Sequence, residues 1–223
     1  MTTDKQRRLN PSRWACATTL AAATFLSACA PLVLGGAMVG GALMVTDRRT
    51  SGTQVEDQSI ELKAQSRIRS AVGGRGHVNA TSYNRSVLLT GEVASNADRG
   101  AVEQAVRGIE NVRSVLNETA VMGDSSMTAR SNDTLITTRV KATLVDAKDI
   151  HGTAMKVVTE RGVVYLLGRV TEREAELATN LARSVNGVLK VVRVFEILTE
   201  AELAALGSST AGPAPAAASA PQK

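Results

Sequence analysis

The sequence predicts an α+β protein made of two tandem copies of one small unit, in which two helices pack on a three-stranded sheet. The main evidence is a repeat of apolar positions, because residues 60, 64 and 68 return 76 residues later as Ile136, Val140 and Leu144. A Val/Leu-rich run at 87–93 returns 77 residues later at 164–170. Positions 109 and 112 return as Val185 and Val188. A nearly constant offset of this kind is typical of an internal duplication.

Each copy is expected to run helix, strand, strand, helix, strand. The first helix has apolar residues at i, i+4 and i+8, the spacing of one helical face. Segments 154–160 and 163–170 are separated by Arg161-Gly162, which predicts a β-hairpin, and residues 83–86 occupy the same place in the first copy.

The second helix and third strand complete each unit. Thr171 followed by Glu174 has the pattern of a capping box, and Ser95 with Asp98 is a weaker version of it. Residues 188–197 are expected to form the last strand. A unit of about 65 residues has a marginal core of its own, so we expect the two copies to pack on each other.

The chain as a whole divides into six expected segments. They are a signal peptide (1–28), a lipidated Gly/Ala-rich tether (29–54), the first unit (55–122), a linker (123–131), the second unit (132–199) and an Ala/Pro/Ser-rich tail (200–223). The composition of the tail predicts disorder, because it offers too little apolar surface to bury.

The first residues of the chain predict secretion. A cationic leader is followed by an apolar stretch and then by Leu26-Ser27-Ala28-Cys29, which resembles a lipobox, where the signal is cut before cysteine and the thiol is acylated. We therefore expect covalent acyl and diacylglycerol lipid on Cys29 and no other cofactor. Ala30 in place of Asp is similar to lipoproteins exported to the outer membrane. The alternative is an uncleaved membrane anchor at 14–45, which is long enough to span a bilayer.

Charge and composition argue against several functions. The full chain has a formal net charge of +5, but residues 1–28 hold four cations against Asp4, so the mature protein has little excess charge for nucleic acid. With Cys16 removed and Cys29 acylated, no thiol is left for a metal site. His77 and His151 lie in different repeats without a partnered nucleophile. We expect no enzyme activity, metal, nucleic acid or small-molecule substrate.

The unit resembles the BON domain, with a glycine after the second strand and Gly187-Val188 before the third. Two such units behind a lipobox are similar to the dual BON-domain outer-membrane lipoproteins (DolP-like). The resemblance covers roughly residues 26–198. Three further segments also resemble that family, namely residues 47–49 with 52–57, residues 131–140 and residues 170–175.

The resemblance implies a non-enzymatic, lipid-anchored protein on the periplasmic face of the outer membrane. It implies that the first helix of the second unit binds anionic phospholipid and that the protein supports outer-membrane integrity. The family often has tryptophan where this chain has Leu135, and tryptophan is the better interfacial anchor. The alternative is a periplasmic adaptor that docks an envelope assembly, such as the outer-membrane barrel-insertion machinery, through strand edges or the Leu135 face.

A helical projection of residues 133–147 supports a lipid role for this helix. Leu135 falls outside the core face, near cations, as expected of a helix that meets acidic head groups. The candidate phospholipid-binding residues are Leu135, Thr138, Arg139, Lys141, Ala142 and Val145. The alternative is that Leu135 packs on the first unit. Asp133, Asp146 and Asp149 are expected to weaken the basic patch, so that binding is modest and salt-sensitive.

Three glycines are expected to have structural roles, namely Gly91, Gly168 and Gly187. Gly91 and Gly168 recur at corresponding strand ends, which favours backbone turns over ligand loops.

Overall fold

The structure is a computed structural model that describes residues 47–210. These residues belong to one compact unit. Cys29, most of the expected tether, the alternative anchor at 14–45 and the end of the tail at 211–223 lie outside the described residues.

The first copy forms a sheet with β2 at its centre. β2 pairs antiparallel with β1 and parallel with both β3 and β4. The third strand expected from the sequence is therefore split into two short pieces that pair with the same neighbour. The elements of this copy are α3 (Ser51–Val72), β1 (Gly76–Tyr83), β2 (Ser86–Val93), α4 (Asn96–Arg107), β3 (Ser114–Asn117) and β4 (Ala120–Val121).

The second copy repeats this order with an unbroken third strand. Its sheet has the order β5-β6-β7, in which β6 is antiparallel to β5 and parallel to β7. The predicted α+β fold with two units of the same topology is confirmed. The elements are α5 (Met127–Asp146), a 3₁₀ turn η2 (Gly152–Ala154), β5 (Met155–Glu160), β6 (Val163–Val170), α6 (Glu172–Ser184), β7 (Lys190–Ile197) and a further helix α7 (Glu200–Thr210).

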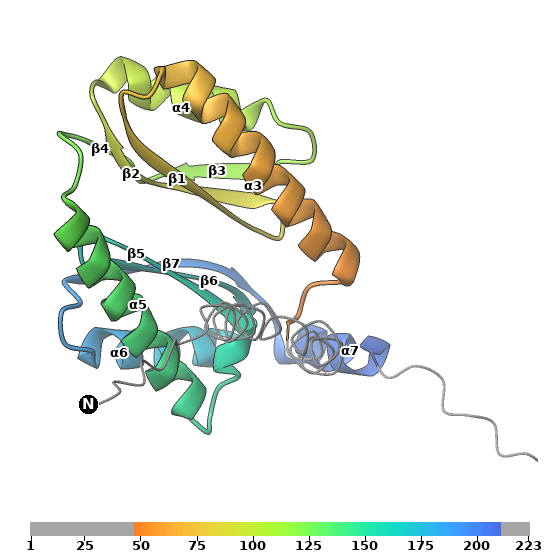
Figure 1. The fold of residues 1–223 in the computed structure, drawn as a ribbon. Coiled ribbons are helices and arrows are strands. Elements are labelled where there is room, and N and C mark those ends of the chain that lie inside the picture. Colours follow the sequence, from red (N-terminus) through yellow and green to blue (C-terminus); the bar gives the residue numbers. More distant parts are fainter. Residues whose placement is uncertain (1–46, 211–223) are drawn as a thin grey trace, which may run out of the picture. The chain divides into compact units, whose positions relative to one another are not determined.

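Helices cover one face of each sheet, and the other faces of the two sheets meet (Figure 1). The first core lies between α3, α4 and the first sheet, and the second lies between α5, α6 and the second sheet. A third cluster, around Tyr83, Leu88, Tyr165 and Leu167, joins the two sheets. The two copies thus bury their remaining apolar surface against each other, as their small size predicts.

Both hairpins turn through two residues with positive φ, as a type I′ turn requires. The turn residues are Asn84-Arg85 in the first copy and Arg161-Gly162 in the second. A buried carboxylate on the preceding helix holds each turn. Asp57 accepts the backbone N–H groups of Asn84 and Arg85 at 2.8 and 2.7 Å, and Asp133 accepts those of Arg161 and Gly162 at 2.8 Å each. The same carboxylate-to-turn interaction is therefore present in both copies.

The expectation that Gly91 and Gly168 form turns at strand ends is wrong, because both lie inside the central strands. Gly91 has φ +106°, and a Cβ there would lie 1.9 Å from the carbonyl oxygen of His77. Gly168 has no such φ, and its Cβ would come no closer than 3.3 Å to other atoms. Gly187 has φ +96° and lies against Ile136. Close backbone approach explains Gly91, and left-handed geometry favours glycine at 187.

Two expected irregular segments are partly helical. Helix α5 begins at Met127, inside the expected linker, because the Ser126 side chain accepts the N–H of Ala129 and caps the helix. Helix α7 occupies 200–210, where the tail was expected to be disordered. Thr199 and Glu202 exchange hydrogen bonds at its start, and these local bonds with a run of Ala, Leu and Glu favour a helix.

Candidate functional site

Helix α5 has one face in the second core and the opposite face in solvent. Ile136, Val140 and Leu144 are fully buried, which confirms the predicted core face. The six candidate phospholipid-binding residues all lie on the exposed part of the same helix: Leu135, Thr138, Arg139, Lys141, Ala142 and Val145. Figure 1 shows α5 on the face of the second sheet that also carries α6.

An apolar stripe runs along the exposed side of α5. Leu135, Thr138, Ala142 and Val145 follow one another at i, i+3, i+7 and i+10, which places them on one side of the helix over about 15 Å. Leu135 and Val145 are 55% and 56% exposed. Leu135 is therefore largely open to solvent, which argues against the alternative that it packs on the first copy.

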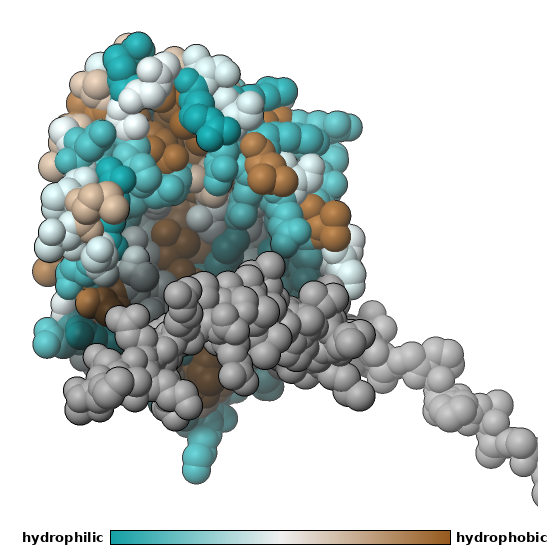
Figure 2. Space-filling model, in the orientation of Figure 1, coloured by the Kyte–Doolittle hydropathy of each residue, from teal (hydrophilic) through white to brown (hydrophobic). Residues whose placement is uncertain are grey.

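Exposed apolar residues alone do not define a site on this protein. On the face shown in Figure 2 they lie as separate spots among hydrophilic residues. Scattered apolar side chains are normal on protein surfaces. The stripe on α5 is distinguished by what surrounds it.

Hydroxyl groups around the stripe are already satisfied within the helix. The side-chain oxygens of Ser131, Thr134 and Thr138 donate to the carbonyls four residues earlier, at 2.9–3.0 Å. Thr143 donates to the carbonyl of Arg139 in the same way. Removing water from a hydroxyl costs less free energy when the hydroxyl already donates to an acceptor within the protein. This side of α5 can therefore enter a poorly hydrated environment at reduced cost.

Cations flank the stripe. Arg139 and Lys141 are exposed, and within residues 47–210 neither forms an ion pair. The expectation that Asp133 weakens this patch is wrong, because its carboxylate is buried and holds the 161–162 turn. Asp146 and Asp149 are exposed, as expected. The surface of α5 thus combines apolar and basic side chains, which is the composition of helices that lie at membrane surfaces.

The sequence analysis missed a strap formed by Arg48 and Arg49, which contacts both copies. Arg48 makes two 2.7 Å bonds to Glu174 and donates to the carbonyl of Arg169 at 2.8 Å. Arg49 pairs with Asp57 at 2.7 Å and lies 4.2 Å over the ring of Tyr83. The sequence signals for it are the two adjacent arginines and the resemblance of residues 47–49 to the family. The strap holds the segment before α3 against both copies.

The strap also acts on the capping box of α6. Burial opposes ionisation of Glu174, but the guanidinium of Arg48 and the N–H of Thr171 outweigh it and lower the pKa of Glu174 to about 2. The predicted capping box is confirmed, since the Thr171 side chain accepts the N–H of Glu174 in return.

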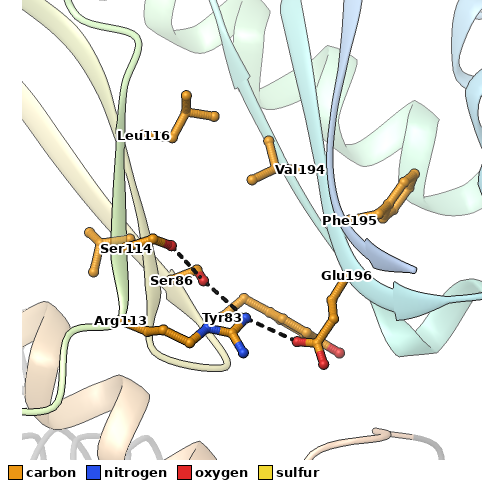
Figure 3. Close-up of a pocket in the computed structure, with 9 residues that line it drawn as sticks. Tyr83, Ser86, Arg113, Ser114, Leu116, Val194, Phe195 and Glu196 are labelled. Atoms are coloured by element: carbon orange, nitrogen blue, oxygen red, sulfur yellow. Dashed lines mark hydrogen bonds and ion pairs between the residues drawn. The ribbon is translucent and has the colours of Figure 1, made fainter. Parts of the chain in front are cut away.

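A cavity of about 250 Å³ lies where the edges of the two sheets meet (Figure 3). Leu116, Val194 and Phe195 line it, and Arg113 of the first copy pairs with Glu196 of the second at 3.2 Å. No group of His, Cys, Asp and Glu in residues 47–210 is arranged to hold a metal ion. In the same residues, no helix is both long and apolar enough to cross a bilayer.

Comparison with known proteins identifies the fold family. The BON domain model matches twice, at residues 56–123 and 132–199. The chain is 37% identical over 181 residues to the outer membrane lipoprotein DolP of Haemophilus influenzae, covering 80% of this chain and 93% of that protein.

Two more distant relatives match over most of their own length. The 21 kDa hemolysin of Actinobacillus pleuropneumoniae is 31% identical, with 67% of this chain and 78% of that protein covered. The osmotically-inducible protein Y of Escherichia coli is 27% identical, with 63% and 72% covered. The chain therefore belongs to the DolP-like family of outer-membrane lipoproteins with two BON domains.

Proposed function

We propose that this protein is a non-enzymatic lipoprotein that binds anionic phospholipid through α5 of its second BON domain and so supports the integrity of the outer membrane. The observation that carries the proposal is the exposed stripe on α5, in which Leu135 and Val145 lie beside cations without ion-pair partners in the described chain. The proposal includes Cys29 as the lipidated residue and 55–122 and 132–199 as the two domains.

The expected affinity of α5 alone is modest. Burying one leucine side chain contributes about 1.5–3 kcal/mol, and a cation near an anionic surface contributes about 1 kcal/mol. Leucine is also a weaker interfacial residue than tryptophan. A lipid chain on Cys29 would keep the helix close to the bilayer, and this high local concentration compensates for weak binding by α5.

Vesicle co-sedimentation tests the proposal. The segment 47–210 contains both hydrophobic cores and the contacts described above, so it can be purified without the lipid anchor. We expect it to sediment with anionic vesicles and not with zwitterionic ones. Leu135→Asp should abolish sedimentation, because it places a carboxylate in the centre of the apolar stripe.

Leu62→Asp is the matched control for this substitution. Leu62 is 70% exposed on α3, the corresponding helix of the first domain. The control should bind vesicles as the wild type does, and both variants should keep the wild-type circular dichroism spectrum. Equal binding by Leu135→Asp and wild type would place the lipid site elsewhere.

A second candidate function is that of an adaptor for an envelope protein assembly. It is favoured by the edge strand β7, which within residues 47–210 pairs only with β6 over its eight residues and borders the cavity in Figure 3. Unpaired strand edges can accept a strand of a partner. No vesicle binding by the wild-type segment would favour this function over lipid binding.

A further inference from the structure

The seam between the two BON domains has two ends of opposite character. At one end the charges are complementary. Lys156 pairs with Glu61 at 2.6 Å, Asn84 donates to Glu196 at 2.6 Å, and Arg113 pairs with the same carboxylate. The middle is apolar, with Leu88 of the first sheet in one cluster with Tyr165 and Leu167 of the second.

At the other end two acids are buried, one from each domain. Glu92 on β2 is fully buried, and Glu160 on β5 is 6% exposed. Within residues 47–210, Oε1 of Glu92 has no hydrogen-bond partner, and its Oε2 accepts from Ser125 at 3.3 Å. The carboxylate of Glu160 accepts from Asn79 at 3.5 Å, which is too long for a strong bond. The charged form of Glu160 is therefore poorly stabilised, and one buried oxygen of Glu92 has no hydrogen-bond partner in the described chain.

The charged groups around this pair do not supply the missing stabilisation. His77 lies opposite Glu92 across the strand pair, but its ring contacts Asn79. Arg130 of α5 donates to Ser125. The other ionisable groups near the pair are Asp133 on α5, Arg161 in the hairpin turn, Tyr165 on β6 and Glu118 after β3. A polar cavity of about 170 Å³ lies here, lined by His77, Arg130, Asp133 and Glu160 among others.

The direction of the pKa shift agrees with this geometry. Burial is the largest cause that raises the pKa of Glu160, followed by the nearby carboxylates of Glu92 and Asp133, while Asn79 and Arg161 oppose the rise less effectively. Burial and a nearby carboxylate both oppose ionisation of Glu160. A neutral Glu160 carboxyl removes this repulsion and has an O–H group that can donate.

We propose that the domain seam is a pH-sensitive contact, which closes when Glu160 binds a proton beside Glu92 and loosens at this end when Glu160 is charged. The ion-paired end of the seam does not depend on this proton and acts as the hinge. The loosened end includes Ser125, Arg130 and Asp133, so the change also reaches the first turns of α5.

The sign of the effect follows from linkage. An acid with a raised pKa in the folded state stabilises the fold below its unfolded pKa, near 4.5, and this contribution is lost as pH rises through the folded value. Wild-type stability should therefore decline as pH rises above about 4.5. A glutamine at position 160 cannot ionise and should remove the decline, whereas a glutamine at position 92 takes away the neighbouring carboxylate and should lessen the decline.

Thermal unfolding of the full mature chain in detergent between pH 5 and 8 tests the proposal. At pH 8, Glu160→Gln should raise the unfolding midpoint by about 2–4 °C over wild type, and the difference should shrink toward pH 5. Glu92→Gln should act in the same direction, and the double variant should add little. Glu110→Gln, at an exposed glutamate that makes none of the seam contacts described above, should follow the wild-type profile.

A distance measurement on the otherwise wild-type sequence tests the same claim without a glutamine variant. Spin labels on cysteines introduced at the exposed positions 96 and 131 should lie farther apart at pH 8 than at pH 5. Equal distances at the two pH values would overturn the proposal. Parallel unfolding profiles for wild type and both glutamine variants would overturn it as well.

Discussion

Helices α3 and α5 occupy the same place in the two BON domains, and they differ on the side that faces solvent. Their buried positions correspond, with Ile60, Ala64 and Ile68 in one and Ile136, Val140 and Leu144 in the other. The outward stripe of α5 has Leu135, Thr138, Ala142 and Val145, where α3 has Ser59, Leu62, Ser66 and Arg69. The duplication has kept the residues that make the core and changed those on the outward face, where the proposed lipid contact lies.

Among equivalent positions of the two domains, the two strand glycines should differ most in the free energy of unfolding that is lost on substitution by alanine. Gly91→Ala should destabilise the protein by more than about 3 kcal/mol or prevent folding, because its Cβ would collide with the His77 carbonyl at a left-handed φ. Gly168→Ala should cost only about 1 kcal/mol, since its nearest contact is 3.3 Å and its φ is ordinary. Urea unfolding measures both. Similar losses in the free energy of unfolding for the two variants would contradict the difference in backbone geometry between the two strands.

The two aspartates that bind the hairpin turns should differ less in the free energy of unfolding lost on substitution by alanine. Asp57 accepts bonds from Ser82 and Arg49 as well as from the turn, whereas in the described part of the chain Asp133 is bonded to the turn alone. Although burial opposes ionisation, these bonds lower the pKa of Asp57. We expect Asp57→Ala to cost about 3 kcal/mol and Asp133→Ala about 2 kcal/mol in the same urea experiment. A larger cost at Asp133 would contradict this assignment.

The acidic residues that cap α4 and α6 should contribute differently to thermal stability as the pH falls. Glu174, with a pKa of about 2, is paired to Arg48, whose side chain is 9% exposed, while the equivalent Asp98 is paired to Arg75, whose side chain is 62% exposed. A lowered pKa gives stability that is present above about 4.5 and is lost as pH falls toward 2. Wild type should therefore exceed Glu174→Gln in thermal stability at pH 6, and the gap should close toward pH 2.5. Asp98→Asn should give a smaller gap, and a larger one would show that the strap contributes little.

Exchanging residues between the two outward stripes should alter lipid binding with the smallest change in stability. Leu135→Ser with Ala142→Ser gives α5 the α3 residues, and binding of segment 47–210 to anionic vesicles should fall about tenfold. The reverse pair, Ser59→Leu with Ser66→Ala, should leave α5 binding intact and add weak binding by α3. If the first exchange had no effect, the stripe would not be the contact surface.

The sequence predicted the features that depend on local pattern. Apolar spacing predicted the core faces of α3 and α5, and Arg161-Gly162 predicted the hairpin, because turns and helical faces are encoded by nearby residues. The contacts of Arg48 with Glu174, and of Glu92 with its surroundings at the seam, join residues far apart in the chain. They depend on how the two sheets meet, which periodicity does not encode. Asp133 was misplaced on the basic patch for the same reason, since its turn partner lies 28 residues away.

The most direct test of the account is a chemical-shift map of segment 47–210 titrated with anionic lipid micelles. We expect the largest shifts at Leu135, Thr138, Ala142 and Val145, and small ones at the equivalent α3 positions 59, 62, 66 and 69. Shifts concentrated on α3 or on the β7 edge, with α5 unchanged, would contradict the claim that α5 binds the membrane.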